Sequence, residues 1–312
     1  MTLTWVVGDH GLLGHALVGA MPFGTVMYEA PIRFRWADAA VLHDQLERAV
    51  AGFATAARAA GEWAIYWAAG VGTMQSDAAS LAPETAALQI LLAQLEAHPG
   101  LQRSPGRFML ASSAGAIYAG SREALISENS NTAPTTHYAM AKLEQEQRVA
   151  EYSARHPNVA VLAARYSTLY GEGQSAGKSQ GLLTHISRQV IRGLPVRIYV
   201  PLDTIRDYLE VNDAARATIA ASELIAPGSA VTKIIAAERP TTISEIITVF
   251  RRASPRPPKI ITSTTRASAL YAKRIQFRSS VRPDVRPSYR TSLLVGIAGL
   301  LEAERRRFAA AA

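Results

Sequence analysis

The sequence contains no cysteine, which excludes disulfide bonds, zinc–thiolate sites and a thiol nucleophile. It also lacks a run of about 18 apolar residues, so we expect no membrane-spanning helix. No basic stretch precedes an apolar one at the start of the chain, and we predict no signal peptide. The seven histidines show no metal-ligand spacing, so we expect no metal. These absences fit a cytoplasmic protein, which is the predicted location.

The composition is that of an ordinary globular protein, with 48% hydrophobic and 19% charged residues among 312. Its net charge of +8 favours acidic partners such as nucleotides or sugar phosphates, with a solvated basic surface as the alternative. No basic patch with interleaved aromatic residues marks a nucleic-acid reader, so we predict no nucleic-acid partner.

Strand and helix patterns alternate over about 165 residues. Strands are predicted at 2–7, 25–29, 32–36, 63–69, 107–112 and 159–165, and helices follow to about residue 20 and at 39–51, 84–97 and 136–155. This alternation predicts an α/β fold with a doubly wound parallel sheet. Beyond residue 170 the regularity fades, and we expect a smaller C-terminal lobe.

Three glycines separate the first predicted strand from the first helix. Gly8, Gly11 and Gly14 follow each other at intervals of three. Glycines at such a turn allow a tight bend, a close approach to a pyrophosphate and close helix packing, and the helix N-terminus offers N–H groups to phosphate. The turn therefore predicts dinucleotide binding, with a purely structural turn as the alternative.

Tyr138 and Lys142 lie four residues apart in a helical pattern. Residues at this spacing share one face of a helix. A nearby cation favours the phenolate and lowers the pKa of a tyrosine from about 10. The pair is therefore a candidate acid/base centre, although Tyr-x-x-x-Lys also occurs on many surface helices.

Five segments in order resemble the extended short-chain dehydrogenase/reductase family, the NAD(P)-dependent sugar epimerase/dehydratase group. They are the glycine turn, residues 112–118, the Tyr138/Lys142 element, residues 165–171 and residues 206–216. The resemblance implies a Rossmann domain at 1–165, to which 205–222 returns, and a smaller substrate lobe at 166–312. It also implies a homodimer with no membrane association.

The same resemblance implies roles for single residues. The three glycines would wrap the pyrophosphate, and Ala68 and Ala69 would lie along the cofactor. Tyr138 would handle the proton of the substrate hydroxyl, and Lys142 would bind the nicotinamide ribose and lower the pKa of the tyrosine. Arg206 would face the phosphates of a nucleotide sugar.

The chain departs from the family at three places. The third catalytic residue, a Ser or Thr, falls on Ala114, so Ser113 is the candidate substitute. Thr168 stands where the family often has an Asn that helps to hold a nucleotide-sugar phosphate. Glu29 favours NAD through the adenosine ribose, whereas Arg33 and Arg35 are the alternative for the 2′-phosphate of NADP or are solvent-facing strand residues.

The predicted function is therefore an NAD(P)-dependent sugar-nucleotide epimerase or dehydratase that transfers a hydride at a carbinol. One alternative is a carbonyl reductase of a non-sugar substrate. The other is a nucleotide-binding sensor that has lost its chemistry, which Ala114 favours and the retained Tyr138 and Lys142 oppose.

Overall fold

The computed structural model describes residues 1–173, 181–263, 273–285 and 290–310. Within them, the main sheet has six parallel strands in the order β2-β1-β3-β4-β5-β9. These strands are β1 (Thr2–Val7), β2 (Val26–Met27), β3 (Glu62–Trp67), β4 (Gly106–Ser113), β5 (Val159–Tyr166) and β9 (Ala230–Ile235). The predicted doubly wound sheet is confirmed, and it takes up one strand from beyond residue 222.

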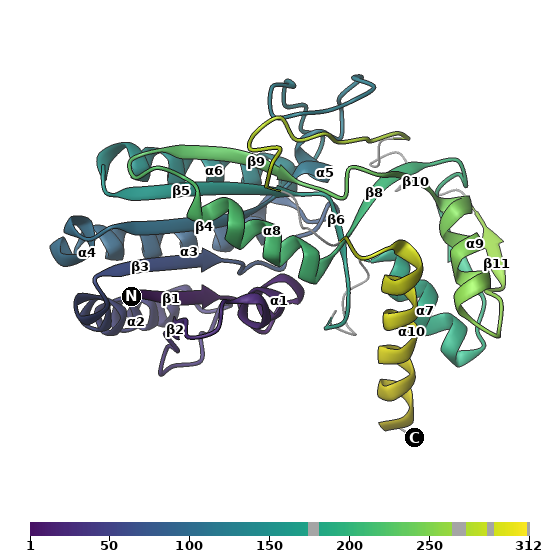
Figure 1. Ribbon diagram of the computed structural model, residues 1–312, viewed down its shortest axis with the longest axis horizontal. Coiled ribbons are helices and arrows are strands. Elements are labelled where there is room, and N and C mark those ends of the chain that lie inside the picture. The colour runs from purple at the N-terminus through teal and green to yellow at the C-terminus, as the bar shows by residue number, and fades with distance from the viewer. Residues whose placement is uncertain (174–180, 264–272, 286–289, 311–312) are drawn as a thin grey trace.

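Helices cover both faces of this sheet (Figure 1). On one face lie α1 (Leu12–Ala20) and α8 (Val211–Glu223), and on the other α2 (Ala39–Ala60), α3 (Ala78–Glu96) and α6 (His137–Arg155), with the short α4 (Pro99–Arg103) and α5 (Ala114–Ile117). Alternate residues of a strand point to opposite faces of the sheet and pack into different cores. Leu3, Trp5 and Val7 pack with α2, whereas Val6 packs with α1.

The C-terminal part forms a smaller lobe with its own hydrophobic core, which we call the second layer. Its strands are β6 (Thr168–Tyr170), β7 (Val196–Ile198), β8 (Ile205–Glu210), β10 (Pro240–Thr242) and β11 (Ile260–Thr262), and its helices are α7 (Leu182–Arg192), α9 (Ile243–Ala253) and α10 (Leu293–Ala310). The order β10-β8-β6 forms one small sheet, and β11-β7 forms another. Figure 1 shows these elements beside the carboxyl ends of the main strands.

The structure corrects two predicted strands near the start. Residues 32–36 form no strand, and the strand predicted at 25–29 is only Val26–Met27. The backbones of Arg33 and Arg35 bond the Gln45 side chain of α2 instead of a neighbouring strand. Aromatic side chains in this stretch stack on the main core, with Trp36 edge-on to Trp67 at 6.0 Å between ring centroids. Tertiary packing therefore replaces the sheet edge that the β-branched and aromatic residues suggested.

Two predicted helices are longer than the sequence indicated. The helix at 39–51 continues to Ala60, and its predicted cap Asp38 accepts a hydrogen bond from Val41 N at 3.2 Å. The helix at 84–97 begins at Ala78, because Asp77 caps it through Ser80 N at 2.8 Å. Glu84 therefore lies inside α3 rather than at its start.

Candidate active site

Three loops meet at the carboxyl ends of β1, β3 and β4, the edge where open parallel sheets bind ligands. The glycine turn follows β1, Ala68 and Ala69 follow β3, and Ser113 ends β4. The strands are adjacent in the order β1-β3-β4, so these segments are neighbours. The sheet thus collects residues that are far apart in the sequence.

The glycine turn is packed too tightly for side chains. Gly8 has a φ of +91°, and a Cβ there would lie 2.7 Å from the backbone nitrogen of Ala69. A Cβ on Gly14 would lie 2.1 Å from the carbonyl oxygen of Gly8. The N–H of Gly11 donates to that same carbonyl oxygen at 3.0 Å. Gly11 precedes the first residue of α1, so the first N–H groups of this helix face the turn without a side-chain cap.

Tyr138 lies in the first turn of α6, partly buried. Thr136 caps this helix by accepting a hydrogen bond from Ala139 N at 3.2 Å. The Ser113 side chain lies next to the Tyr138 phenol and partly offsets the rise in its pKa, and its Oγ accepts from Ala116 N at 3.3 Å. Ala114 is fully buried in α5. The structure therefore brings Ser113, and not Ala114, to Tyr138.

Lys142 is buried, with 6% of its surface exposed. Its Nζ donates to the carbonyl oxygen of Ala111 at 3.2 Å and to Oε1 of Gln145 at 3.0 Å. It lies 5.8 Å from the centroid of the Tyr138 ring. The expectation that this lysine lowers the pKa of Tyr138 is wrong for this arrangement. Burial, reinforced by the negative charge of Glu84, raises the pKa of Tyr138 to about 12.

A buried ion pair lies beside this cluster. Arg165 on β5 donates to Glu146 on α6, with Nη2 to Oε2 at 2.6 Å and Nε to Oε1 at 2.9 Å. The Ser112 hydroxyl donates to the same carboxylate at 2.5 Å, and Arg165 Nη1 donates to the Tyr118 hydroxyl at 2.5 Å. These bonds join α6 to the ends of β4 and β5 and so fix the helix that carries Tyr138.

The predicted substrate residues lie on the small sheet of the second layer. Thr168 on β6 pairs with Tyr208 on β8. Arg206 precedes Tyr208 by two residues, so its side chain leaves the same face of the strand. Both Thr168 and Arg206 are half-buried, and Nη1 of Arg206 donates to the carbonyl oxygen of Ile205 at 2.8 Å. The structure thus gathers the two residues on one face of one sheet.

The candidate cofactor-discriminating residues lie after β2 on an exposed, irregular segment. Glu29, Arg33 and Arg35 are all exposed. The two arginines face solvent, as one interpretation predicted, but residues 32–36 form no strand, so the strand part of that interpretation is wrong. All three side chains remain available beside the sheet edge.

A sequence model described as the NAD dependent epimerase/dehydratase family matches residues 32–234 of this chain. The chain belongs to this family. The matched range includes Tyr138, Lys142, Ser113 and Arg206 and covers more than half of the sequence.

Other epimerase/dehydratase-like proteins share the whole fold at low identity. RMD from Pseudomonas aeruginosa, solved with NADPH, has a TM-score of 0.79 at 20% identity and covers 98% of this chain and 100% of its own. UDP-glucose 4-epimerase from Thermotoga maritima, solved with UDP-glucose, has a TM-score of 0.75 at 18% identity and covers 99% and 100%. These likenesses establish the Rossmann-like fold.

A curated relative is dTDP-4-dehydro-6-deoxyglucose reductase from Escherichia coli, 26% identical over 117 residues. The match covers 38% of this chain and 36% of the reductase, so it spans about a third of each protein.

Glu84 is a residue of this site that no sequence motif indicated. Its Oε1 accepts hydrogen bonds from the N–H groups of Val71 and Gly72, in the loop between β3 and α3. Burial raises the pKa of Tyr138, and the negative charge of Glu84 adds to this rise. Burial lowers the pKa of Lys142, and the same charge partly offsets that fall. A carboxylate in the middle of a mostly apolar helix was the signal that could have indicated it.

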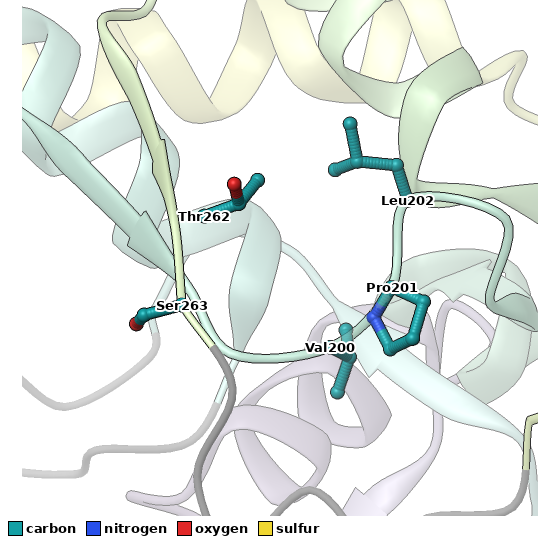
Figure 2. A pocket seen from close by; sticks show the side chains of 5 residues that line it. All are labelled: Val200, Pro201, Leu202, Thr262 and Ser263. Carbon is teal, nitrogen blue, oxygen red and sulfur yellow. The ribbon is translucent and has the colours of Figure 1, made fainter.

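A cavity of about 440 Å³ in the second layer was also missed. Figure 2 shows its lining side chains, which are Val200, Pro201, Leu202, Thr262 and Ser263. It lies between the loop that follows β7 and the end of β11. The lining residues among those the structure describes bear no charge, so no sequence motif marked it.

Over the described residues, no group of three or more His, Cys, Asp or Glu side chains gathers in a way that could hold a metal ion. In the same part of the chain, no helix has the length and apolar character needed to cross a membrane.

Proposed function

We propose that this protein is an NAD(P)-dependent oxidoreductase that transfers a hydride at a carbinol or carbonyl carbon of a nucleotide sugar. The observation that carries the proposal is the position of the Tyr138 phenol. It lies beside Ser113 and Lys142, at the carboxyl ends of the strands, where the glycine turn also lies. A sensor that only binds nucleotides has no use for a buried acid/base cluster, so we favour the enzyme.

The glycine turn fits a dinucleotide. Side chains at Gly8 or Gly14 would collide with neighbouring backbone, so the turn stays bare and open to close approach by a pyrophosphate. The N–H groups of α1 point to the same place and favour an anion. Ala68 and Ala69 border the turn and would lie along the bound molecule. When bound, the nicotinamide supplies the hydride chemistry.

Both dinucleotides are compatible with the site. Glu29 favours NAD through hydrogen bonds to the adenosine ribose, whereas Arg33 and Arg35 favour the 2′-phosphate of NADP. RMD was solved with NADPH, and UDP-glucose 4-epimerase from Thermus thermophilus with NAD. We propose NAD first and NADP as the alternative.

Tyr138 would exchange the proton of the substrate oxygen. In the oxidative direction its phenolate takes the proton of a hydroxyl as hydride leaves the carbon. In the reductive direction its phenol donates a proton to a carbonyl oxygen as hydride arrives. Ser113 would donate a hydrogen bond to the same oxygen. The buried Lys142 would bind the ribose of the cofactor through its ammonium group.

A nucleotide-sugar reductase is the second candidate. A tyrosine whose pKa is raised to about 12 is a phenol at neutral pH, which suits proton donation to a carbonyl. The curated relative is also named as a nucleotide-sugar reductase. Reduction of a non-sugar carbonyl compound remains the alternative substrate class.

The nucleotide part of the substrate would bind in the second layer. Arg206 and Thr168 share one sheet face, and a guanidinium suits phosphate oxygens. We also propose the division into a nucleotide-binding domain (1–165, with 205–222 returning to it) and a substrate lobe (166–312), with the correction that β9 (Ala230–Ile235) also returns to the main sheet. A homodimer is the proposed assembly.

Two measurements test the function. Fluorescence titration with NADH and NADPH should show binding, and a thermal-shift panel of nucleotide sugars should raise the melting temperature with the correct substrate class. Tyr138→Phe should then retain dinucleotide binding and lose turnover by at least about 10²-fold.

Tyr152→Phe is the matched control, because Tyr152 lies on the same helix about 21 Å further along. It should leave turnover within about twofold. Unchanged turnover in Tyr138→Phe would refute the proposed chemistry.

A further inference from the structure

Glu84 forms a clamp between α3 and the loop that leaves β3. One carboxylate oxygen, Oε1, accepts from the N–H of Val71 at 2.6 Å and of Gly72 at 2.5 Å. Such short bonds are typical of an ionised acceptor, which strengthens them relative to neutral pairs. Leu88 and Leu91 are fully buried on the same helix, so the base of the clamp is rigid.

The clamped loop lies against Tyr138. A Cβ on Gly72 would lie 2.4 Å from Cδ2 of Leu81, 3.2 Å from Cδ2 of Tyr138 and 3.3 Å from Oε1 of Glu84. A side chain at this three-way contact would displace Leu81 and press on the Tyr138 ring. The loop backbone thus fills the space between the carboxylate and the ring.

The other end of the same loop lies against the glycine turn. A Cβ on Gly8 would lie 2.7 Å from the backbone nitrogen of Ala69, and a Cβ on Gly70 would lie 3.0 Å from Oε2 of Glu84. Further along, Met74 Sδ lies 3.8 Å from the hydroxyl oxygen of Thr136, the cap of α6. The loop therefore connects the proposed pyrophosphate site to the proposed acid/base residue.

We propose that Glu84 is a positioning residue that holds residues 69–72 in the form that leaves room for the dinucleotide between the glycine turn and Tyr138. The inference rests on the proposed function, since it assigns the clamp to the same cofactor site. It predicts that releasing the two amides loosens the wall of that site and weakens dinucleotide binding.

The chemistry of the clamp provides a selective test. Because a single oxygen accepts both bonds, the amide oxygen of Glu84→Gln can accept them too, whereas Glu84→Ala removes the acceptor. The carboxylate of Glu96, about 18 Å further along α3, accepts from Arg155 and His156, so Glu96→Ala is a matched control.

The first measurement is amide hydrogen exchange of Val71 and Gly72 in the protein without cofactor. Both amides should exchange at least about tenfold faster in Glu84→Ala and near the wild-type rate in Glu84→Gln and Glu96→Ala. Unchanged exchange in Glu84→Ala would overturn the clamp, whether or not the protein binds a dinucleotide.

The second measurement is the affinity for NADH and NADPH by fluorescence titration. Glu84→Ala should bind the preferred dinucleotide at least about tenfold more weakly, about 1.4 kcal/mol, and Glu84→Gln should restore binding to within about threefold. Equal affinity of Glu84→Ala and wild type would overturn the positioning role. If wild type binds neither dinucleotide, the proposed function fails, while the exchange result still decides the clamp.

A second variant covers the case in which Glu84→Ala does not fold. Gly72→Ala keeps the carboxylate but forces a methyl group against Leu81 and Tyr138, so it should weaken dinucleotide binding similarly. Wild-type affinity in Gly72→Ala would contradict the proposed loop position.

Discussion

Replacement of Glu146 by alanine tests how the helix that carries Tyr138 is held in place. Glu146 and Arg165 are 8% and 7% exposed, and three hydrogen bonds join their side chains. Removing the carboxylate leaves the guanidinium buried without its counter-charge. The Ser112 hydroxyl loses its acceptor at the same time.

The expected cost follows from these contacts. Breaking a buried ion pair on one side costs about 3–5 kcal/mol. A buried hydroxyl without a partner costs about 1–3 kcal/mol more when counted alone. Since these losses share one carboxylate and do not add fully, we expect about 4–5 kcal/mol, a large part of the roughly 5–15 kcal/mol that stabilises a typical domain.

Urea unfolding followed by tryptophan fluorescence measures this free energy. Glu144→Ala is the control, because the exposed Glu144–Arg148 pair on the same helix should be worth about 0.3–0.5 kcal/mol. The double variant Glu146→Leu/Arg165→Met should cost less than Glu146→Ala, because it leaves no unpaired charge. A cost below about 1 kcal/mol for Glu146→Ala would refute the reasoning.

Three further outcomes are expected. Gly14→Ala should abolish dinucleotide binding and destabilise the fold, since its Cβ would lie 2.1 Å from a backbone oxygen. Gly19→Ala in the same helix is the control, because its Cβ meets nothing within 4 Å, and it should stabilise the fold by about 0.5–1 kcal/mol. Urea unfolding and fluorescence titration compare the two variants, and equal effects would contradict the packing. Ser113→Ala should lower turnover about 10²-fold without changing dinucleotide affinity, because the substrate oxygen loses one hydrogen-bond donor. Steady-state kinetics measure this, and unchanged turnover would show that Ser113 is not a donor. Folding raises the pKa of Tyr138 and Tyr208 to about 12, from about 10 in an unfolded chain. The free energy of unfolding should therefore keep its full value below pH 10 and fall above it, and it should fall less steeply in Tyr138→Phe. A free energy of unfolding that stays constant between pH 8 and 11 would contradict this.

The sequence predicted those parts of the fold that depend on local pattern. The strand at 159–165 was found almost to the residue, because a continuous β-branched and apolar run of that length is typical of a buried parallel strand. The helix that carries Tyr138 was placed equally well, because Thr136 caps it and the periodicity is clear. The glycine spacing indicated close packing of the first helix against the turn, which the backbone distances confirm.

The errors arose where distant residues compete with local preference. Residues 32–36 have strand composition, but Gln45 binds their backbone and Trp67 stacks on Trp36, so they follow the core instead. The pKa of Tyr138 was misjudged for a similar reason. The spacing placed Lys142 nearby, whereas burial and the charge of Glu84, a residue 54 positions earlier in the sequence, set the direction.

By itself, the sequence determined the alternation of elements, the glycine turn and the Tyr138/Lys142 pair, because each depends on residues close together in the chain. Only the tertiary structure decided that Ser113 rather than Ala114 meets the tyrosine and that Glu84 holds the loop beside it. Those contacts depend on the distances between strand ends and helices in space. The spacing of nearby residues along the chain does not determine these distances.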